Sequence, residues 1–277
     1  MTPSDLDAYC ARIGFAGPRA PTLETLAALH WLHPQAIPFE NLDPLRGLPV
    51  ELSEDALVEK LVRRGRGGYC FEQNGLLAAA LRTLGFDVTT LAARVLHNRP
   101  PTPPGTRSHE LLRVRLPEGD FLADVGFGGL TLTAPLREGA EAEQQTPFGR
   151  YRLVPSGPGR ELQIATPEGW SPVYLVLPDE QVEADREAMN WFTSTHPKSV
   201  FTNNLLAARH AGDRRYGLFN DGLSIHHADG TIERRRLGST AAIAEALRTT
   251  FAVVLPPHSE EALARIPLGG RGAEAGR

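Results

Sequence analysis

Cysteine is scarce in this sequence, which also lacks a long apolar run or an excess of one charge sign. Two cysteines among 277 residues are too few for a disulfide framework. No segment approaches the roughly 18 uninterrupted apolar residues of a membrane span, and the first residues lack a secretory signal pattern. Lysine and arginine total 29 against 33 aspartates and glutamates, which does not favour nucleic acid or an anionic membrane as partner. We expect a soluble, cytoplasmic protein with reduced cysteines.

The first part of the chain has the apolar spacing of short helices. Helical periodicity follows Ser4, Thr22 and Ser53, and it returns at residues 71–84 before Gly85. The three polar residues are candidate N-caps, and the glycine is a candidate helix stop. We therefore expect a helical N-terminal part.

The pattern then changes to short alternating runs, which are typical of a β-barrel or sandwich. Clusters of turn-forming residues separate these runs at residues 98–105, 117–120 and 155–159. A mixed part follows, in which Ser239 is expected to cap a last helix. Its other features are helical spacing at 179–192, strand breaks at 220–222 and 229–230, and a glycine-rich, frayed tail at 269–277.

Cys10 has the sequence context of a core residue. Ser4 and Gly14 are the candidate start and stop of the helix that contains it. The residues expected on the apolar face of this helix are Leu6, Tyr9, Cys10 and Ile13. Because a buried thiol packs as a small apolar group, we expect Cys10 to be structural.

Cys70 has the context of a reactive thiol. Cysteine attacks as the thiolate, whereas a free thiol with a pKa near about 8.5 is mostly protonated at neutral pH. Cys70 follows Gly67 and Gly68 and opens a predicted helix, where the positive end of the helix dipole favours a thiolate. An inert cysteine packed under a glycine turn would fit the same position, so its partners decide between the two interpretations.

A base for Cys70, and a group that orients the base, are expected in the β part. His109 opens one predicted strand, and Asp124 ends the next one. A turn at residues 117–120 places Asp124 on the same face as His109 but directly opposite Arg113. A direct hydrogen bond between His109 and Asp124 therefore needs a bulge, a strong twist or a shifted turn.

If this contact forms, His109 takes the proton of Cys70, and Asp124 fixes the tautomer of the imidazole. Other histidines are interpreted as ordinary structural side chains: His30, His33, His97, His210 and His226. The run Gly126, Phe127, Gly128 and Gly129 follows Asp124. Such a turn allows a ligand to approach the backbone closely, although most glycine-rich turns are only turns.

Several segments together resemble motifs of the arylamine N-acetyltransferases. They are RGGYCFEQN at 66–74, IPFENL at 37–42, SHELL at 108–112, ADVGFGG at 123–129 and THPKSVF at 195–201. The likeness runs from about Tyr9 to Arg209, and the bacterial members are the better analogy because the chain has no room for the long insertion of the animal enzymes.

The resemblance implies an α+β fold with a helical N-terminal domain (1–86), a central β-barrel (87–187), and a linking helix with an α/β lid (188–277). The catalytic core would be cysteine protease-like. By the same resemblance the catalytic residues are Cys70, His109 and Asp124. Residues near coenzyme A would be Thr106, Gly126, Phe127, Gly128 and Gly129, and the amine pocket would be lined by Phe39, Val95, Phe127 and Phe201. An ion pair between Glu40 and Arg66 would brace the nucleophile loop.

The implied reaction moves an acetyl group from acetyl-CoA to arylamines, arylhydroxylamines or hydrazines by a ping-pong mechanism, with acetyl-CoA as co-substrate and no permanent cofactor or metal. A macrolactam-forming amide synthase of the same fold is an alternative. So are a transglutaminase- or papain-like hydrolase, which the context of Cys70 disfavours, and a binding module with an inert thiol. The sequence indicates no particular amine acceptor, acyl-chain preference or oligomeric state.

Overall fold

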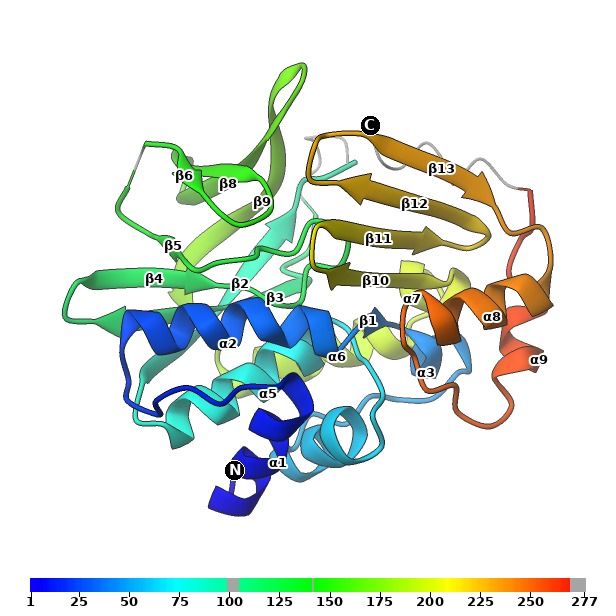
Figure 1. Ribbon diagram of the computed structural model, residues 1–277, viewed down its shortest axis with the longest axis horizontal. Helices are drawn as coiled ribbons and strands as arrows, with labels where there is room; N and C mark the ends of the chain where they lie inside the picture. The colour runs from blue at the N-terminus through cyan, green and yellow to red at the C-terminus, as the bar shows by residue number, and fades with distance from the viewer. Residues whose placement is uncertain (99–104, 141, 270–277) are drawn as a thin grey trace.

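Figure 1 shows the computed structural model, which describes residues 1–98, 105–140 and 142–269. The helices there are α1 (Pro3–Ile13), α2 (Leu23–Ala36), α3 (Leu42–Leu45), α4 (Glu54–Leu57), the π-helix η1 (Val58–Arg63), α5 (Cys70–Thr83), α6 (Glu183–Thr195), α7 (Val200–Asn203), α8 (Thr240–Thr249) and α9 (Ser259–Leu263). The strands there are β1 (Phe39–Glu40), β2 (Asp87–Val95), β3 (His109–Leu116), β4 (Gly119–Ala123), β5 (Leu136–Arg137), β6 (Gln144–Gln145), β7 (Arg150–Ser156), β8 (Gly159–Thr166), β9 (Gly169–Glu180), β10 (Leu206–Ala211), β11 (Arg214–Phe219), β12 (Gly222–His227) and β13 (Ile232–Arg236). The fold class is α+β, as predicted.

Side-chain caps fix the starts of the first helices. Thr22 and Ser53 each accept a hydrogen bond from the backbone N–H group three residues on, which confirms both as N-caps. The prediction of Ser4 is wrong, because Thr2 caps α1 two residues earlier within a capping box. Pro3 explains the earlier start, since proline has the backbone angle of a first helical turn and no N–H group that needs a partner.

Cys10 lies in the core between the helices. α1 ends at Gly14, whose φ of 74° is the left-handed conformation that terminates many helices. The four residues predicted on its apolar face are buried in one cluster with side chains of α2 and α5. Burial raises the pKa of the Cys10 thiol, so the thiol stays neutral and packs as an apolar group, as expected.

The eight-stranded sheet has the order β5-β4-β3-β2-β9-β8-β7-β6 and curls into a nearly closed barrel (Figure 1). Its two edge strands, β5 and β6, are joined by a side chain. The amide of Gln144 accepts a hydrogen bond from the N–H group of Arg137 at 2.8 Å and donates one to its carbonyl oxygen at 3.0 Å. Gln144 thus connects the two edge strands, between which the described residues form no ladder of backbone hydrogen bonds.

The turn between β3 and β4 is shorter than the sequence predicts. Pro117 and Glu118 alone connect the strands, instead of four residues, and two-residue loops are the commonest hairpin connections. The register therefore shifts by two residues, and Arg113 lies opposite Leu122 rather than Asp124. Asp124 follows the last residue of β4, so its backbone is outside the ladder and free to turn toward β3.

β3 separates two cores. Leu112, Val114 and Leu116 pack with the helices, as the alternation predicts, whereas Leu111 faces the barrel interior. α5 packs against β2 and β3. This contact brings Cys70, the first residue of α5, to the start of β3, where His109 lies.

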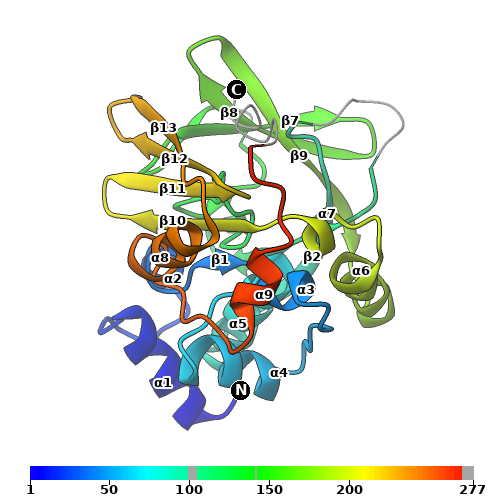
Figure 2. The same ribbon diagram turned by 90° about the vertical axis from the view of Figure 1, so that its right-hand side faces the viewer.

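The five-stranded sheet has the order β1-β10-β11-β12-β13 and includes a strand from the N-terminal part of the chain. β1 pairs antiparallel with β10, with Phe39 opposite Ala208. A third apolar cluster joins this sheet to α3, α8 and α9, and Figure 2 shows α3 beside α9. β1, which lies against the loop that precedes Cys70, is therefore fixed by the last third of the chain.

Other boundaries agree with the sequence in part. The turns at 220–222 and 229–230 and the N-cap Ser239 are confirmed. The helix predicted from residue 179 starts later, because β9 continues to Glu180 and α6 begins at Glu183. The domain boundary expected after residue 187 lies within α6. The turn at 155–159 narrows to residues 157–158. The predicted turn at 98–105 and the predicted tail lie largely outside the described residues. No described helix is long and apolar enough to cross a membrane.

We predict that Cys10→Ala lowers the free energy of unfolding by roughly 1–2 kcal/mol, because it removes one buried sulfur from a packed core. Catalytic turnover should stay near the wild-type value. Urea denaturation and a turnover assay measure the two effects. A folded Cys10→Ala protein without activity would contradict the structural assignment.

Candidate active site

Cys70 lies at the start of α5, as predicted. It is the first helical residue, and its side chain is buried, with 4% of the residue exposed. The preceding N–H group, that of Tyr69, donates to the Glu72 carboxylate at 3.0 Å, which fixes the first turn. The thiol therefore lies at the positive end of the helix dipole.

Two glycines bring the nucleophile loop against β1. The backbone of Gly68 exchanges hydrogen bonds with its neighbours, accepting from Glu40 at 3.1 Å and donating to Pro38 at 3.3 Å. A Cβ atom on Gly67 would lie 2.1 Å from the carbonyl oxygen of Pro38. The two glycines thus allow the loop to lie directly against the backbone of Pro38 and β1.

A buried network of charges braces this loop. Arg66 Nη2 lies 2.7 Å from Glu40 Oε1, which confirms the predicted ion pair, and Arg66 Nη1 lies 2.9 Å from Asp43. Lys60 continues the network to Asp43 at 2.7 Å and to Glu72 at 2.5 Å. Burial opposes ionisation of Asp43, but Lys60 and Arg66 lower its pKa to about 2. The first turn of α5 is thus tied by charge to residues upstream.

His109 and Asp124 are in direct contact. His109 Nε2 and Asp124 Oδ2 are 2.8 Å apart, and both side chains are buried. The shifted turn between β3 and β4, one of the three devices that the sequence argument requires, accounts for this contact. Because Asp124 occupies Nε2, Nδ1 is the nitrogen left for Cys70.

Electrostatics favour a charged imidazole in this site. Burial lowers the pKa of His109, but the charge and hydrogen bond of Asp124, followed by the hydrogen bond and charge of Cys70, outweigh burial and raise it to about 10. Burial likewise raises the pKa of Asp124, but His109, Asn74 and the Gly126 N–H group reverse the effect and lower it. The Cys70 thiol also lies 3.7 Å from the Ser108 carbonyl oxygen.

Asn74 contacts the site through three hydrogen bonds, and the sequence argument gives it no role. Its amide donates to Asp124 Oδ1 at 3.0 Å and to the Glu110 carbonyl oxygen at 2.6 Å, and its oxygen accepts from the Val125 N–H group at 3.0 Å. The sequence does hold a clue to this residue, because position 74 lies four residues after Cys70 and therefore on the same face of the predicted helix. Asn74 therefore joins the nucleophile helix to the strand of the base and to the aspartate turn.

His30 was interpreted as an ordinary structural histidine, and the structure gives it a contact with the site. Its Nε2 accepts the N–H group of Asp124 at 3.0 Å. Burial lowers the pKa of His30 to about 4, so Nε2 keeps the lone pair that this bond needs. No sequence spacing links position 30 to position 124. Another of these histidines, His33, bonds Tyr9 and Gln73 in the core.

Aromatic rings surround the thiol and the imidazole. Phe127 and Tyr174 have ring centroids 4.9 and 5.0 Å from that of His109. Phe39 and Phe201 belong to the apolar cluster that includes Cys70, and their own centroids are 6.2 Å apart. Phe127 thus packs on the His109 ring, and Phe39 and Phe201 share an apolar cluster with Cys70.

The remaining predicted contact residues lie further out. Val95 is half-buried on β2 opposite Tyr174, which packs on His109. Thr106 is exposed in the segment before β3. Their roles in binding coenzyme A and the amine stay predictions.

The glycine turn after Asp124 is required by the protein's own packing. A Cβ atom on Gly126 would lie 2.8 Å from both Cys70 Cα and Asn74 Nδ2. Gly128 has a φ of 79°, and a Cβ atom there would lie 3.6 Å from the Phe39 ring, whereas a Cβ atom on Gly129 would meet nothing within 4 Å. Gly126 therefore sets the distance between the aspartate turn and the nucleophile.

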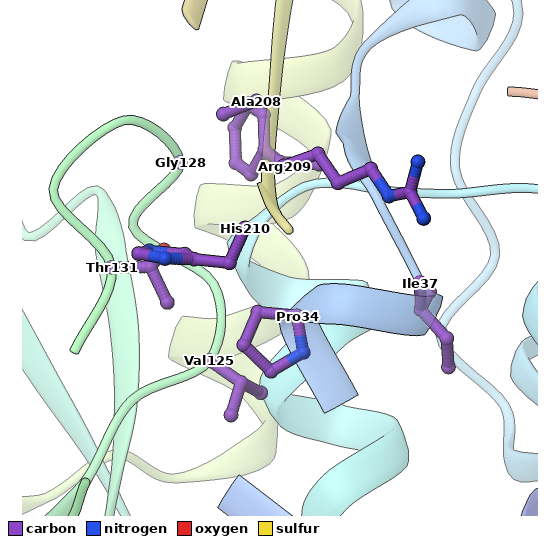
Figure 3. A pocket seen from close by; sticks show the side chains of 9 residues that line it. Pro34, Ile37, Val125, Gly128, Thr131, Ala208, Arg209 and His210 are labelled. Atoms are coloured by element: carbon purple, nitrogen blue, oxygen red, sulfur yellow. The ribbon is translucent and has the colours of Figure 1, made fainter. Parts of the chain in front are cut away.

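A small pocket lies behind this turn, next to Phe39 (Figure 3). Its lining residues are Pro34, Ile37, Phe39, Val125, Gly128, Thr131, Ala208, Arg209 and His210. Its volume of about 10 Å³ is enough for about one water molecule, so an aromatic amine does not fit there. Within the described ranges, no group of three or more His, Cys, Asp or Glu side chains has the arrangement of a metal site.

Comparison with known proteins gives a consistent family. The sequence model described as N-acetyltransferase matches residues 22–260. The arylamine N-acetyltransferase of Mycolicibacterium smegmatis is 42% identical over 91% of this chain and 92% of its own length. A Salmonella typhimurium protein named arylamine N-acetyltransferase / N-hydroxyarylamine O-acetyltransferase is 41% identical over 90% and 88%. The structure of the Mycobacterium marinum arylamine N-acetyltransferase in complex with CoA has a TM-score of 0.89 and 41% identity, and the match covers 94% of this chain and 98% of that one.

The fold, the cysteine at the helix start and these matches together define an acyltransferase enzyme. The chain belongs to the arylamine N-acetyltransferase family, whose similar members here include several bacterial proteins. The resemblance expected from the sequence motifs is confirmed.

We predict that Gly126→Ala lowers the free energy of unfolding by about 1–3 kcal/mol, because the added methyl group would press on the Cys70 backbone. It should also change the rate at which iodoacetamide alkylates Cys70. Gly129→Ala is the matched control in the same turn, and it should leave both quantities unchanged. Equal effects of the two substitutions would contradict the packing argument.

A second prediction concerns the pH dependence of Cys70 alkylation. The raised pKa of His109 keeps the imidazolium present across neutral pH, where it stabilises the thiolate, so the wild type should react well at about pH 6, where a free thiol is mostly protonated. In Asp124→Asn, an amide N–H that faces Nε2 would favour the wrong tautomer. Rapid reaction should then require higher pH. Identical profiles for the two proteins would make Asp124 a structural residue and reduce the triad to a Cys70 and His109 pair.

Proposed function

We propose that this enzyme transfers the acetyl group of acetyl-CoA to arylamines, arylhydroxylamines or hydrazines through a thioester on Cys70. The observation that carries the proposal is the buried pair of His109 and Asp124, 2.8 Å apart, together with Cys70, which is buried at the start of α5 and contributes to the raised pKa of His109. The names of the relatives support arylamines and arylhydroxylamines as acceptors, and the CoA complex of the Mycobacterium marinum enzyme supports acetyl-CoA as donor. Acetyl-CoA acts as a co-substrate.

In the first half-reaction, the Cys70 thiol gives its proton to His109 Nδ1, and Sγ attacks the carbonyl carbon of acetyl-CoA. The C–S bond to coenzyme A then breaks, and the leaving thiolate takes the proton from His109. Asp124 stabilises the imidazolium through Nε2 and keeps the ring oriented. The products are free coenzyme A and acetylated Cys70.

In the second half-reaction, the amine nitrogen attacks the Cys70 thioester while His109 accepts a proton from the nitrogen. The bond between the acetyl carbon and Sγ breaks, and the thiol recovers its proton. Because coenzyme A leaves before the amine reacts, the kinetics are ping-pong. Backbone N–H groups at the start of α5, including that of Cys70, hold the oxyanion of both tetrahedral intermediates.

The substrate contacts follow the family resemblance. We assign the amine to the aromatic residues around Cys70, namely Phe39, Phe127 and Phe201, together with Val95. Coenzyme A is assigned to Thr106 and the turn from Gly126 to Gly129. The ring contacts of Phe127 with His109 and the shared cluster of Phe39, Phe201 and Cys70 support the first assignment.

The cytoplasm is the proposed compartment, because the mechanism needs a reduced thiol. Both Cys10 and Cys70 are free cysteines, and a reducing compartment keeps them so.

The rival functions differ from this one in their products and substrates. A hydrolase would release acetate without an amine, and an amide synthase would need a carrier-bound polyketide.

Intact-mass measurement tests the proposal directly. After mixing with acetyl-CoA and no acceptor, the wild type should gain the mass of one acetyl group on Cys70, and an added arylamine should remove it. Cys70→Ala should stay folded but gain no acetyl group and show no turnover. Substantial turnover by Cys70→Ala would refute the thioester mechanism, and an acetyl group lost equally fast without amine would indicate a hydrolase.

A further inference from the structure

Arg186 lies on α6, outside the catalytic residues, yet its guanidinium reaches the neighbours of two of them. Arg186 Nε donates to Glu110 Oε2 at 2.6 Å, and Nη2 donates to the Phe71 carbonyl oxygen at 3.2 Å. Glu110 directly follows the base, and Phe71 directly follows the nucleophile. One planar guanidinium group therefore links the strand of His109 to the helix of Cys70.

The surroundings of Arg186 are shaped for this contact. The side chain is 10% exposed and that of Glu110 is 1% exposed, so the ion pair is shielded from solvent. A Cβ atom on Gly75 would lie 2.7 Å from Arg186 Nη2. Glycine destabilises a helix interior, and its presence in α5 leaves the space that the guanidinium occupies.

Glu110 is held from both sides. Its carboxylate binds Arg186, while its carbonyl oxygen accepts from Asn74, which also binds Asp124. Burial raises the pKa of Glu110 to about 7, although Arg186 opposes the shift. Without the guanidinium this carboxylate would be an unpaired buried group, which proteins avoid by moving or neutralising it.

We propose that Arg186 is a positioning residue for acyl transfer: through Glu110 and the Phe71 carbonyl oxygen, it holds His109 at the distance from Cys70 that proton transfer requires. The proposal rests on the thioester mechanism above. Since a misplacement of about 1 Å can cost 100-fold in rate, losing this link should slow acylation much more than it weakens binding of acetyl-CoA.

The main test compares Arg186→Met, which keeps length but removes every donor, with Arg186→Lys, which keeps the charge but lacks the planar fork. Arg186→Met should lower kcat roughly 10- to 100-fold with little change in KM. The pH profile of Cys70 alkylation by iodoacetamide should shift toward higher pH. Arg186→Lys should recover part of both losses, because one ammonium group can still pair with Glu110.

Glu183→Gln is the matched control on the same helix. Glu183 contacts the same guanidinium at 3.2 Å, but its side chain is 66% exposed, so kcat and the alkylation profile should match the wild type. Glu110→Gln removes the carboxylate from the other side and should shift the alkylation profile as Arg186→Met does. It serves as the deciding variant if Arg186→Met does not fold.

Two results would overturn the proposal: an unchanged alkylation profile and kcat in folded Arg186→Met, or, if that variant does not fold, an unchanged profile in Glu110→Gln. Failure of the proposed function is distinguishable, because the wild type itself would then form no acetylated Cys70. If the wild type is acetylated and the variant is acetylated equally fast, only the role of Arg186 is refuted.

Discussion

The buried charge of Asp124 is the constraint on which the rest of the site depends. Removing a carboxylate from water costs several kcal/mol unless hydrogen bonds and a counter-charge compensate. Here the compensation comes from three places in the chain, since Asp124 accepts from His109, Asn74 and the Gly126 N–H group. The strand of the base, the nucleophile helix and the aspartate turn must therefore come together for the charge to be tolerated. The interaction that orients the catalytic imidazole also selects the packing of α5 against the barrel.

The sequence predicted what depends on local spacing and missed what depends on one turn or on distant contacts. The caps Thr22 and Ser53 and the alternation of β3 follow from short-range rules, and the structure agrees with them. The pairing of Asp124 with Arg113 failed because it assumed a four-residue turn where two residues suffice. His30 could not be found at all, because 94 residues separate it from the N–H group that it accepts. The family motifs located the site. The polar groups that support it, such as Asn74 and His30, could be identified only from the packing of the folded chain.

Charge is used differently on the two sides of the nucleophile. Upstream, Arg66 and Lys60 share the carboxylates of Glu40, Asp43 and Glu72, so the loop before Cys70 carries a network in which each charge has a partner. Around Asp124, by contrast, the Asn74 amide and the Gly126 N–H group donate to the carboxylate, and His109 provides the compensating charge. This arrangement leaves the Asp124 charge to act on His109.

The pairing of β1 with β10 also bears on how the enzyme is made. Asn41, directly after β1, accepts from a backbone N–H group 165 residues later in the sequence. On the ribosome, β1 and the nucleophile segment emerge long before β10. While the barrel is synthesised, β1 therefore lacks the strand with which it pairs in the native fold. Contacts of such long sequence separation slow folding and leave strand edges exposed in the interval. A competent catalytic centre is therefore a late product of biosynthesis, and a truncated chain that ends with the barrel would leave β1, the strand against which the loop before Cys70 packs, without its partner.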